Sequence, residues 1–159
     1  MDLLDRLLDH DHWATTQLLD VSRNLTDAQL DQEFDIGHRT LHATFEHLIF
    51  NIEAWTAVMA GQPVERGRDD RPLAALIDRH ERSYATFAAL ARQVRDEQRL
   101  EETFADHFCE RLPFAAGIVH VMLHNAEHRT EALHILTRLG VPDPPEIDHA
   151  LWEHETQRI

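Results

Sequence analysis

Residues 114–142 read FAAGIVHVMLHNAEHRTEALHILTRLGVP, and this stretch decides the fold. It is rich in residues that favour helices, and Pro113 stands immediately before its first residue. Gly140 and Pro142 follow the last apolar positions, which is the usual signature of a helix end. The stretch therefore predicts one long helix over residues 114–139.

Three other stretches repeat apolar residues at helical spacing, and the few glycines and prolines of the chain separate them. We expect these long helices over Asp2–Ser22, Arg39–Met59 and Pro72–Val94. The connections between long helices have roughly 12–17 residues, which is more than simple up-down bundles use. The pattern predicts an all-α protein, a four-helix bundle with long crossover connections.

Shorter elements are expected between and after the long helices. Residues 26–29 combine a threonine N-cap with a glutamine three residues later, which predicts one capped turn of helix. Residues 102–112 carry aromatic side chains two to four positions apart and are compatible with a short hairpin. The tail, residues 146–157, has apolar side chains at helical spacing and predicts one more short helix.

Composition limits the class of protein. The 159 residues fit one domain over residues 1–159, and the single Cys excludes an internal disulfide framework. No apolar run approaches the roughly 18 residues of a membrane span, and the N-terminus does not resemble a signal peptide. A formal net charge of −14 opposes binding to nucleic acid and to anionic lipid. We therefore expect a globular protein of the reducing cytoplasm.

Histidine is the outlier of the composition, with 13 copies. His120, His124 and His128 follow one another at four-residue intervals, so they lie near one face of the predicted helix. Two imidazoles one turn apart reach a common point, as in helical metal sites of the H-x-x-x-H type. The zincin motif HExxH is not present, because Glu127 stands directly before the second histidine of the pair. The pair predicts a metal ligand set, with core or surface histidines that only satisfy hydrogen bonds as the alternative.

A third ligand has to come from another helix, and periodicity does not choose it decisively. His47 stands beside small residues that leave room for a metal, and we favour it over His42 and His38. His42 and His47 are about 140° apart around a helix, so one metal ion cannot easily take both. His10 and His12 of the first helix are further candidates, although a solvated or hydrogen-bonded role suits them better.

Glu131 lies on the same helix face as the histidines, about 20° from His124. It is our candidate catalytic residue, because its carboxylate could orient an imidazole or take a proton at the metal. A salt bridge to Arg129 or Arg138 is an equally good interpretation. The only thiol, Cys109, falls in a loop, and we expect it to have no role in the site.

Parts of the chain resemble the DinB-like superfamily of small four-helix proteins. The resemblance is carried by Asp11–Leu19, Leu41–Trp55 and His124–Pro142. The last of these is similar to the family's His-x-x-x-His-Arg-Gly-Gln followed by Leu-Gly-Val-Pro, and Asp148 in the tail also fits. The resemblance implies a helical bundle that often dimerises. It also implies a divalent metal ion bound by the residues that match the family's ligands, His47, His124 and His128.

The resemblance implies a chemistry as well. Characterised relatives include metal- and thiol-dependent S-transferases and a maleylpyruvate isomerase. This chain has Thr130 and Glu131 where Gly-Gln is usual, which adds a carboxylate on the metal face. The substrate preference of the relatives therefore does not carry over directly to this chain.

Three imidazoles from two helices leave coordination positions for water or substrate, which is typical of catalytic sites. Zn, Ni and Fe all suit such ligands. We predict a homodimeric, metal-dependent enzyme that activates water or a low-molecular-weight thiol for hydrolysis or transfer on an unknown small-molecule substrate. The alternatives are a non-catalytic, stress-related metal-binding protein and a helical dimerisation module with incidental histidines.

Overall fold

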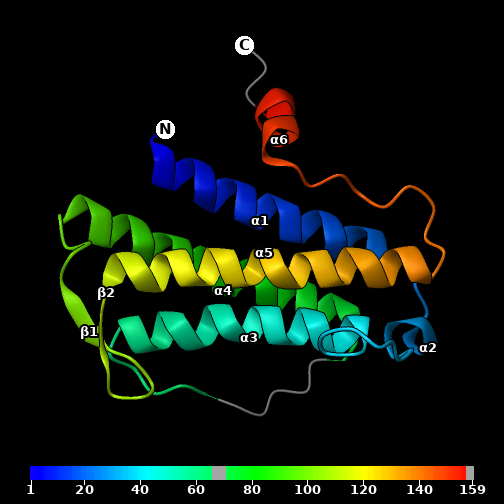
Figure 1. Ribbon diagram of the computed structural model, residues 1–159, viewed down its shortest axis with the longest axis horizontal. Helices are drawn as coiled ribbons and strands as arrows, with labels where there is room; N and C mark the ends of the chain where they lie inside the picture. Colours follow the sequence, from blue (N-terminus) through cyan, green and yellow to red (C-terminus); the bar gives the residue numbers. More distant parts are fainter. Residues whose placement is uncertain (66–70, 157–159) are drawn as a thin grey trace. The chain divides into compact units, whose positions relative to one another are not determined.

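Figure 1 shows the computed structural model of the chain, which describes residues 1–65 and 71–156. Within these residues the chain forms six helices and one pair of short strands. The elements are α1 Leu3–Ser22, α2 Asp27–Leu30, α3 Leu41–Met59, α4 Leu73–Asp96, β1 Thr103–Ala105, β2 Arg111–Pro113, α5 Phe114–Arg138 and α6 His149–Thr156. Across the described part of the chain, no helix combines the length and apolar character needed to traverse a bilayer. The predicted all-α class is confirmed and is consistent with a helical bundle.

The helices group into two units, and each is described by itself. Unit 1 comprises Met1–Phe45 and Ala126–Ile159, and unit 2 comprises Glu46–Asn125. The boundaries fall inside α3 and inside α5, so these two helices contribute a segment to each unit. Unit 1 also holds α1, α2 and α6, whereas unit 2 holds α4 and both strands.

Side chains accept hydrogen bonds from backbone N–H groups at the start of α1 and of α2. Asp2 accepts a hydrogen bond from the backbone N–H of Asp5 at 2.9 Å, and the Asp5 carboxylate accepts one from the backbone N–H of Asp2 at 3.4 Å. Thr26 and Gln29 form the same reciprocal arrangement at α2 with distances of 3.2 and 2.9 Å, which confirms the predicted capped turn. The inward stripe of α1 includes the buried side chains Leu8, Leu18 and Leu19.

The third helix, α3, begins two residues later than predicted, at Leu41 instead of Arg39. Gly37 and Arg39 have φ angles of +44° and +71°, so a right-handed helix cannot include them. Gly61, with φ at +67°, follows the end of α3 as the sequence predicts. The fully buried apolar side chains of α3 are Leu41, Phe45, Leu48, Ile49 and Ile52.

The segment between α4 and α5 forms the predicted hairpin in unit 2. Strands β1 and β2 pair antiparallel, with Phe104 opposite Leu112. The turn is closed by Asp106, whose Oδ1 accepts a hydrogen bond from the backbone N–H of Phe108 at 2.8 Å. The buried ring of Phe104 packs 5.3 Å from that of Phe114, so the hairpin is tied to the first turn of α5.

The long α5 ends at Arg138, one residue before its predicted end, and Gly140 follows with φ at +75°. The tail then forms α6, so the predicted short helix is present, although it begins at His149 and not at residue 146. Asp148 caps α6, because its Oδ1 accepts a hydrogen bond from the backbone N–H of Ala150 at 2.8 Å. The predicted last residue of this helix, Gln157, lies outside the described residues.

His10 ties the tail to α1 within unit 1. Its Nε2 lies 3.0 Å from the carbonyl oxygen of Ile147 and donates a hydrogen bond to it. The His10 ring also packs against the rings of His149 and Trp152, with centroid distances of 5.0 and 5.8 Å. His10 therefore has a hydrogen-bonded role, one of the two roles predicted for it from the sequence.

We expect this attachment to weaken in acid. Burial lowers the pKa of His10 below its ordinary value, against the raising effect of the hydrogen bond to Ile147. A histidine with a lowered folded-state pKa stabilises the fold above its unfolded pKa of about 6.5, and that contribution is lost as the pH falls. Replacing His10 by Gln should therefore flatten the decline in the free energy of unfolding between about pH 7 and pH 5, measured by urea denaturation. His134→Gln, at an exposed site, is the control, and an unchanged decline in H10Q would contradict the assignment.

Candidate metal centre

Two imidazoles meet between α3 and α5 within unit 2. His47 comes from α3 and His124 from α5, and their Nε2 atoms lie 2.9 Å apart. The ring centroids are 5.1 Å apart. Two nitrogen ligands of one zinc ion, each about 2.0–2.1 Å from the metal, lie roughly 3 Å apart. The pair therefore fits either one N–H···N hydrogen bond or a shared divalent cation.

Further aromatic rings flank this pair. His120 stands one turn before His124 on α5 and stacks on it, with ring centroids 5.3 Å apart and ring planes at 28°. The indole of Trp55 lies 4.5 Å from the His120 ring. His120 is exposed, whereas His47 and His124 are half-buried. His120 therefore shields one side of the His124 ring from solvent.

A second pair of histidines lies in unit 1. His128 Nδ1 lies 2.7 Å from Oε2 of Glu131, and the ring of His38 lies 5.0 Å from that of His128. A ring nitrogen of His38 and one of His128 lie within 4.8 Å of each other. When Nδ1 donates its proton to a carboxylate, the lone pair of the neutral ring is on Nε2, as in metal-bound histidines with a carboxylate partner. Glu131 therefore orients His128 in the tautomer that a metal ligand needs.

Gly37 makes room for the Glu131 carboxylate. A Cβ built on Gly37 would overlap with that carboxylate, and the φ angle of +44° favours glycine at this position. The same left-handed turn leads directly into His38, whose ring then packs on His128. One short turn in unit 1 thus positions both neighbours of the His128 ring.

Arg129 holds this part of α5 against α1. Its Nη1 donates hydrogen bonds to Oδ1 of Asp11 and, at 3.3 Å, to Oγ1 of Thr15, all of them buried. Arg138 pairs with an aspartate in the connection before α3. Both arginines that were alternative partners of Glu131 thus bind aspartates. These pairings favour the orienting role of Glu131 over a salt bridge.

Each unit holds some of the predicted site residues. His47 and His124 meet in unit 2, and His128 pairs with Glu131 in unit 1. His38 is the residue that sequence reasoning undervalued, because it lies before the helix and gains its position from a turn. The signal that could have identified it is the glycine directly before it, which permits a left-handed conformation.

Two other candidates lie in different surroundings. His42 is buried in the first turn of α3, with 8% of its surface exposed. Cys109 is exposed in the hairpin turn and has a φ angle of +63°.

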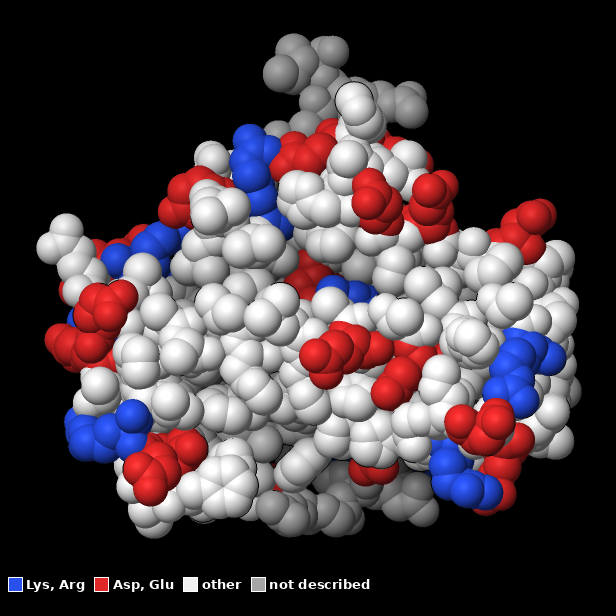
Figure 2. All heavy atoms as spheres, in the orientation of Figure 1, with Lys and Arg blue, Asp and Glu red and all other residues white. Residues whose placement is uncertain are grey.

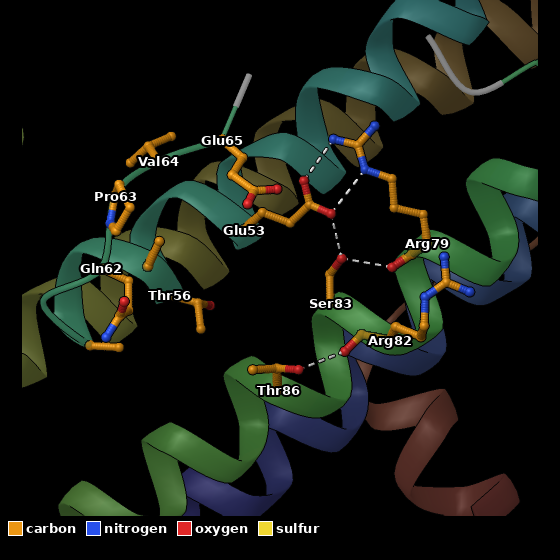
Figure 3. A pocket seen from close by; sticks show the side chains of 12 residues that line it. Glu53, Thr56, Gln62, Pro63, Val64, Glu65, Arg79, Arg82, Ser83 and Thr86 are labelled. Atoms are coloured by element: carbon orange, nitrogen blue, oxygen red, sulfur yellow. Dashed lines mark hydrogen bonds and ion pairs between the residues drawn. The ribbon is translucent and has the colours of Figure 1, made fainter. Parts of the chain in front are cut away.

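A larger cavity of about 440 Å³ opens in unit 2 beside α3 and α4 (Figure 3). The Arg79 guanidinium donates two hydrogen bonds to the Glu53 carboxylate, from Nε at 2.9 Å and from Nη2 at 2.7 Å. The Ser83 hydroxyl donates to the same carboxylate at 2.8 Å. Figure 3 shows these groups converging on the wall of the cavity. Because the two charges neutralise each other, we interpret the cluster as an ion pair that joins α3 to α4.

The exposed surface carries paired charges. On the face shown in Figure 2, acidic side chains in red are spread over the surface, and several basic side chains in blue adjoin them. Exposed ion pairs of this kind contribute little stability individually. Examples are the ion pairs Arg39–Glu33 and Arg99–Glu102.

The sequence matches the DinB family over residues 1–158, nearly its whole length. No curated protein is found to match the chain. The matched range contains every histidine and carboxylate of the two groups described above.

The ion pair in the larger cavity should be needed for stability. Arg79 has a side chain that is only 4% exposed, so Glu53→Leu would remove the carboxylate that accepts two hydrogen bonds from a buried guanidinium. We expect the free energy of unfolding to fall by about 3–5 kcal/mol in E53L, measured by urea denaturation. The double variant Glu53→Leu with Arg79→Met should recover most of this loss, since it buries no charge. A double variant as unstable as E53L would contradict the interpretation.

The glycine before His38 offers a matched test of the Glu131 contact. Gly37→Ala should displace the Glu131 carboxylate and abolish the NMR signal of the His128 Nδ1 proton. Gly61→Ala is the control, because Gly61 also has a positive φ angle but no atom of the described residues lies near the added methyl group. Both variants should lose about 1–2 kcal/mol of stability through backbone strain. A retained proton signal in G37A would show that Gly37 does not position Glu131.

Proposed function

Because the chain belongs to the DinB family, we propose that it is a metal-dependent enzyme whose divalent ion is bound by His47, His124 and His128. It acts on a small-molecule substrate through an activated water or low-molecular-weight thiol. The reaction class is hydrolysis or group transfer, which includes thiol-dependent S-transfer.

One observation carries this proposal: the Nε2 atoms of His47 and His124 face each other at 2.9 Å. His128 follows His124 by one turn on the continuous helix α5 and shares its helix face. Its Nδ1 is bound to Glu131, so its lone pair is on Nε2. Each of the three rings is therefore suited to bind a metal ion through its own Nε2 atom.

The donor set fits the proposed ion. Imidazole nitrogens suit Zn, Ni and Fe, and three of them leave positions for water or substrate. The chemistry that a bound divalent ion supplies is a lower pKa for a coordinated water or thiol.

The side chains of the protein supply orientation. Glu131 holds the Nδ1 proton of His128, so we assign it the role of a positioning residue. Its carboxylate is kept in place by the close approach of Gly37. The ring of His120 covers one side of His124 and limits access of water to that ligand.

A second candidate function is metal binding without turnover. The ring of His38 lies 5.0 Å from that of His128, and a fourth imidazole would close the coordination sphere as in structural sites. Cobalt-substituted protein distinguishes the two functions. Addition of azide or 2-mercaptoethanol should change the visible spectrum of an open site and leave that of a closed site unchanged.

Metal content tests the ligand set. Untagged wild-type protein should contain about one divalent ion per chain, and His124→Ala should lose it, measured by mass spectrometry of the metal after dialysis. Glu131→Gln should weaken the affinity for metal by about 10–100-fold in a chelator competition titration, because the ring of His128 loses its orienting partner. His134→Ala, an exposed histidine on the same helix, is the control and should bind metal as the wild type does. Full metal content in H124A would refute the proposed site.

A further inference from the structure

A smaller cavity of about 170 Å³ lies in unit 2 beside the ring of His47. Most of its lining comes from one face of α3, with His107 contributed by the hairpin turn. Its walls are largely apolar and include the rings of Phe50 and Trp55. The cavity therefore offers a largely hydrophobic space beside a proposed metal ligand.

One side chain of this cavity is a buried hydrogen-bond donor. Asn51 is only 7% exposed, and among the described residues no acceptor lies within hydrogen-bond distance of its Nδ2. A buried amide without an acceptor is costly and uncommon in native proteins, so it marks the place of a missing partner. Asn51 follows His47 by one turn of α3, so the amide and the imidazole line the same wall.

We propose that this cavity is the substrate pocket and that Asn51 donates a hydrogen bond to a carbonyl oxygen of the substrate. The aromatic and aliphatic walls bind the flat apolar body of the same molecule. The assignment of this ligand as the substrate rests on the proposed metal-dependent function, since the pocket adjoins His47.

The lining also limits the charge and size of the ligand. No Lys, Arg, Asp or Glu is among the described residues that line the pocket, so none of these side chains can form an ion pair with a charged ligand there. An uncharged carbonyl compound is favoured over a carboxylate, because the net charge of −14 also repels anions. Pockets for drug-sized ligands have about 300–1,000 Å³, so this one suits a molecule with a single ring.

Trp55 is held as part of the pocket wall. Its ring lies edge-on to those of Phe104 and His107, at centroid distances of 6.2 and 5.7 Å. The hairpin therefore supports the indole from the side. A flat ligand can then pack against a fixed aromatic surface, with its oxygen directed to Asn51.

The test compares two probes of the same shape. Acetophenone carries a carbonyl oxygen and ethylbenzene does not, and each is titrated into the protein as purified, with dissociation constants taken from ¹H–¹⁵N chemical shifts. We expect acetophenone to bind about tenfold more tightly than ethylbenzene. The side-chain NH₂ signals of Asn51, assigned by their absence from Asn51→Leu, should move downfield with acetophenone alone.

Variants separate the amide from the shape of the pocket. Asn51→Asp keeps the shape of the side chain, whereas Asn51→Leu does not. In both variants acetophenone and ethylbenzene should bind with about equal dissociation constants. Thr56→Val, a buried change on another face of α3, is the control and should keep the wild-type preference.

The results of the probe titrations can be distinguished from the results of the metal analysis. Equal binding of both probes to the wild type, no binding, or a preference that survives in N51L and N51D would each overturn the pocket assignment. The metal content of the same samples reports on the metal site independently. A protein with metal but without probe preference would lose only the pocket assignment, and a protein with probe preference but without metal would lose the proposed function and with it the role of this ligand as substrate.

Discussion

The imidazole pair of His47 and His124 is the constraint on which the site depends. Two ring nitrogens 2.9 Å apart cannot both present a lone pair to each other without a proton or a cation between them. The segments of α3 and α5 in unit 2 can therefore pack this closely at the two histidines only with a ring proton or a cation between the two nitrogens. A bound metal ion would stabilise the unit as well as provide chemistry, because the ligands are brought together only in the folded state.

Buried ion pairs fix the helices that carry the rings. In unit 2 the guanidinium of Arg79 makes a bidentate contact with Glu53, and in unit 1 Arg129 binds Asp11. Burying such charges is costly, so their contribution is to fix the faces of neighbouring helices more than to add stability. A helix rotated by one residue would lose these bonds together with the alignment of its histidines.

Much of the fold could be predicted because its signals are local. The caps at Asp2 and Thr26, the hairpin between α4 and α5 and the short helix in the tail each depend on residues within a few positions of one another. The predicted start of α3 was wrong by two residues, because Arg39 has a φ angle of +71° in the turn before the helix. Gly37 adopts a left-handed conformation against the carboxylate of Glu131, which is 94 positions further along the chain.

By itself, the sequence determined which histidines share a helix face, because helical periodicity is a property of the backbone alone. It thereby placed His120, His124 and His128 together and added Glu131 to them. Only the tertiary structure decided that His47 meets His124 in unit 2 and that His38 packs on His128 in unit 1. These meetings depend on the rotation of each helix about its axis and on the path of a turn, which the packing of many distant side chains sets together.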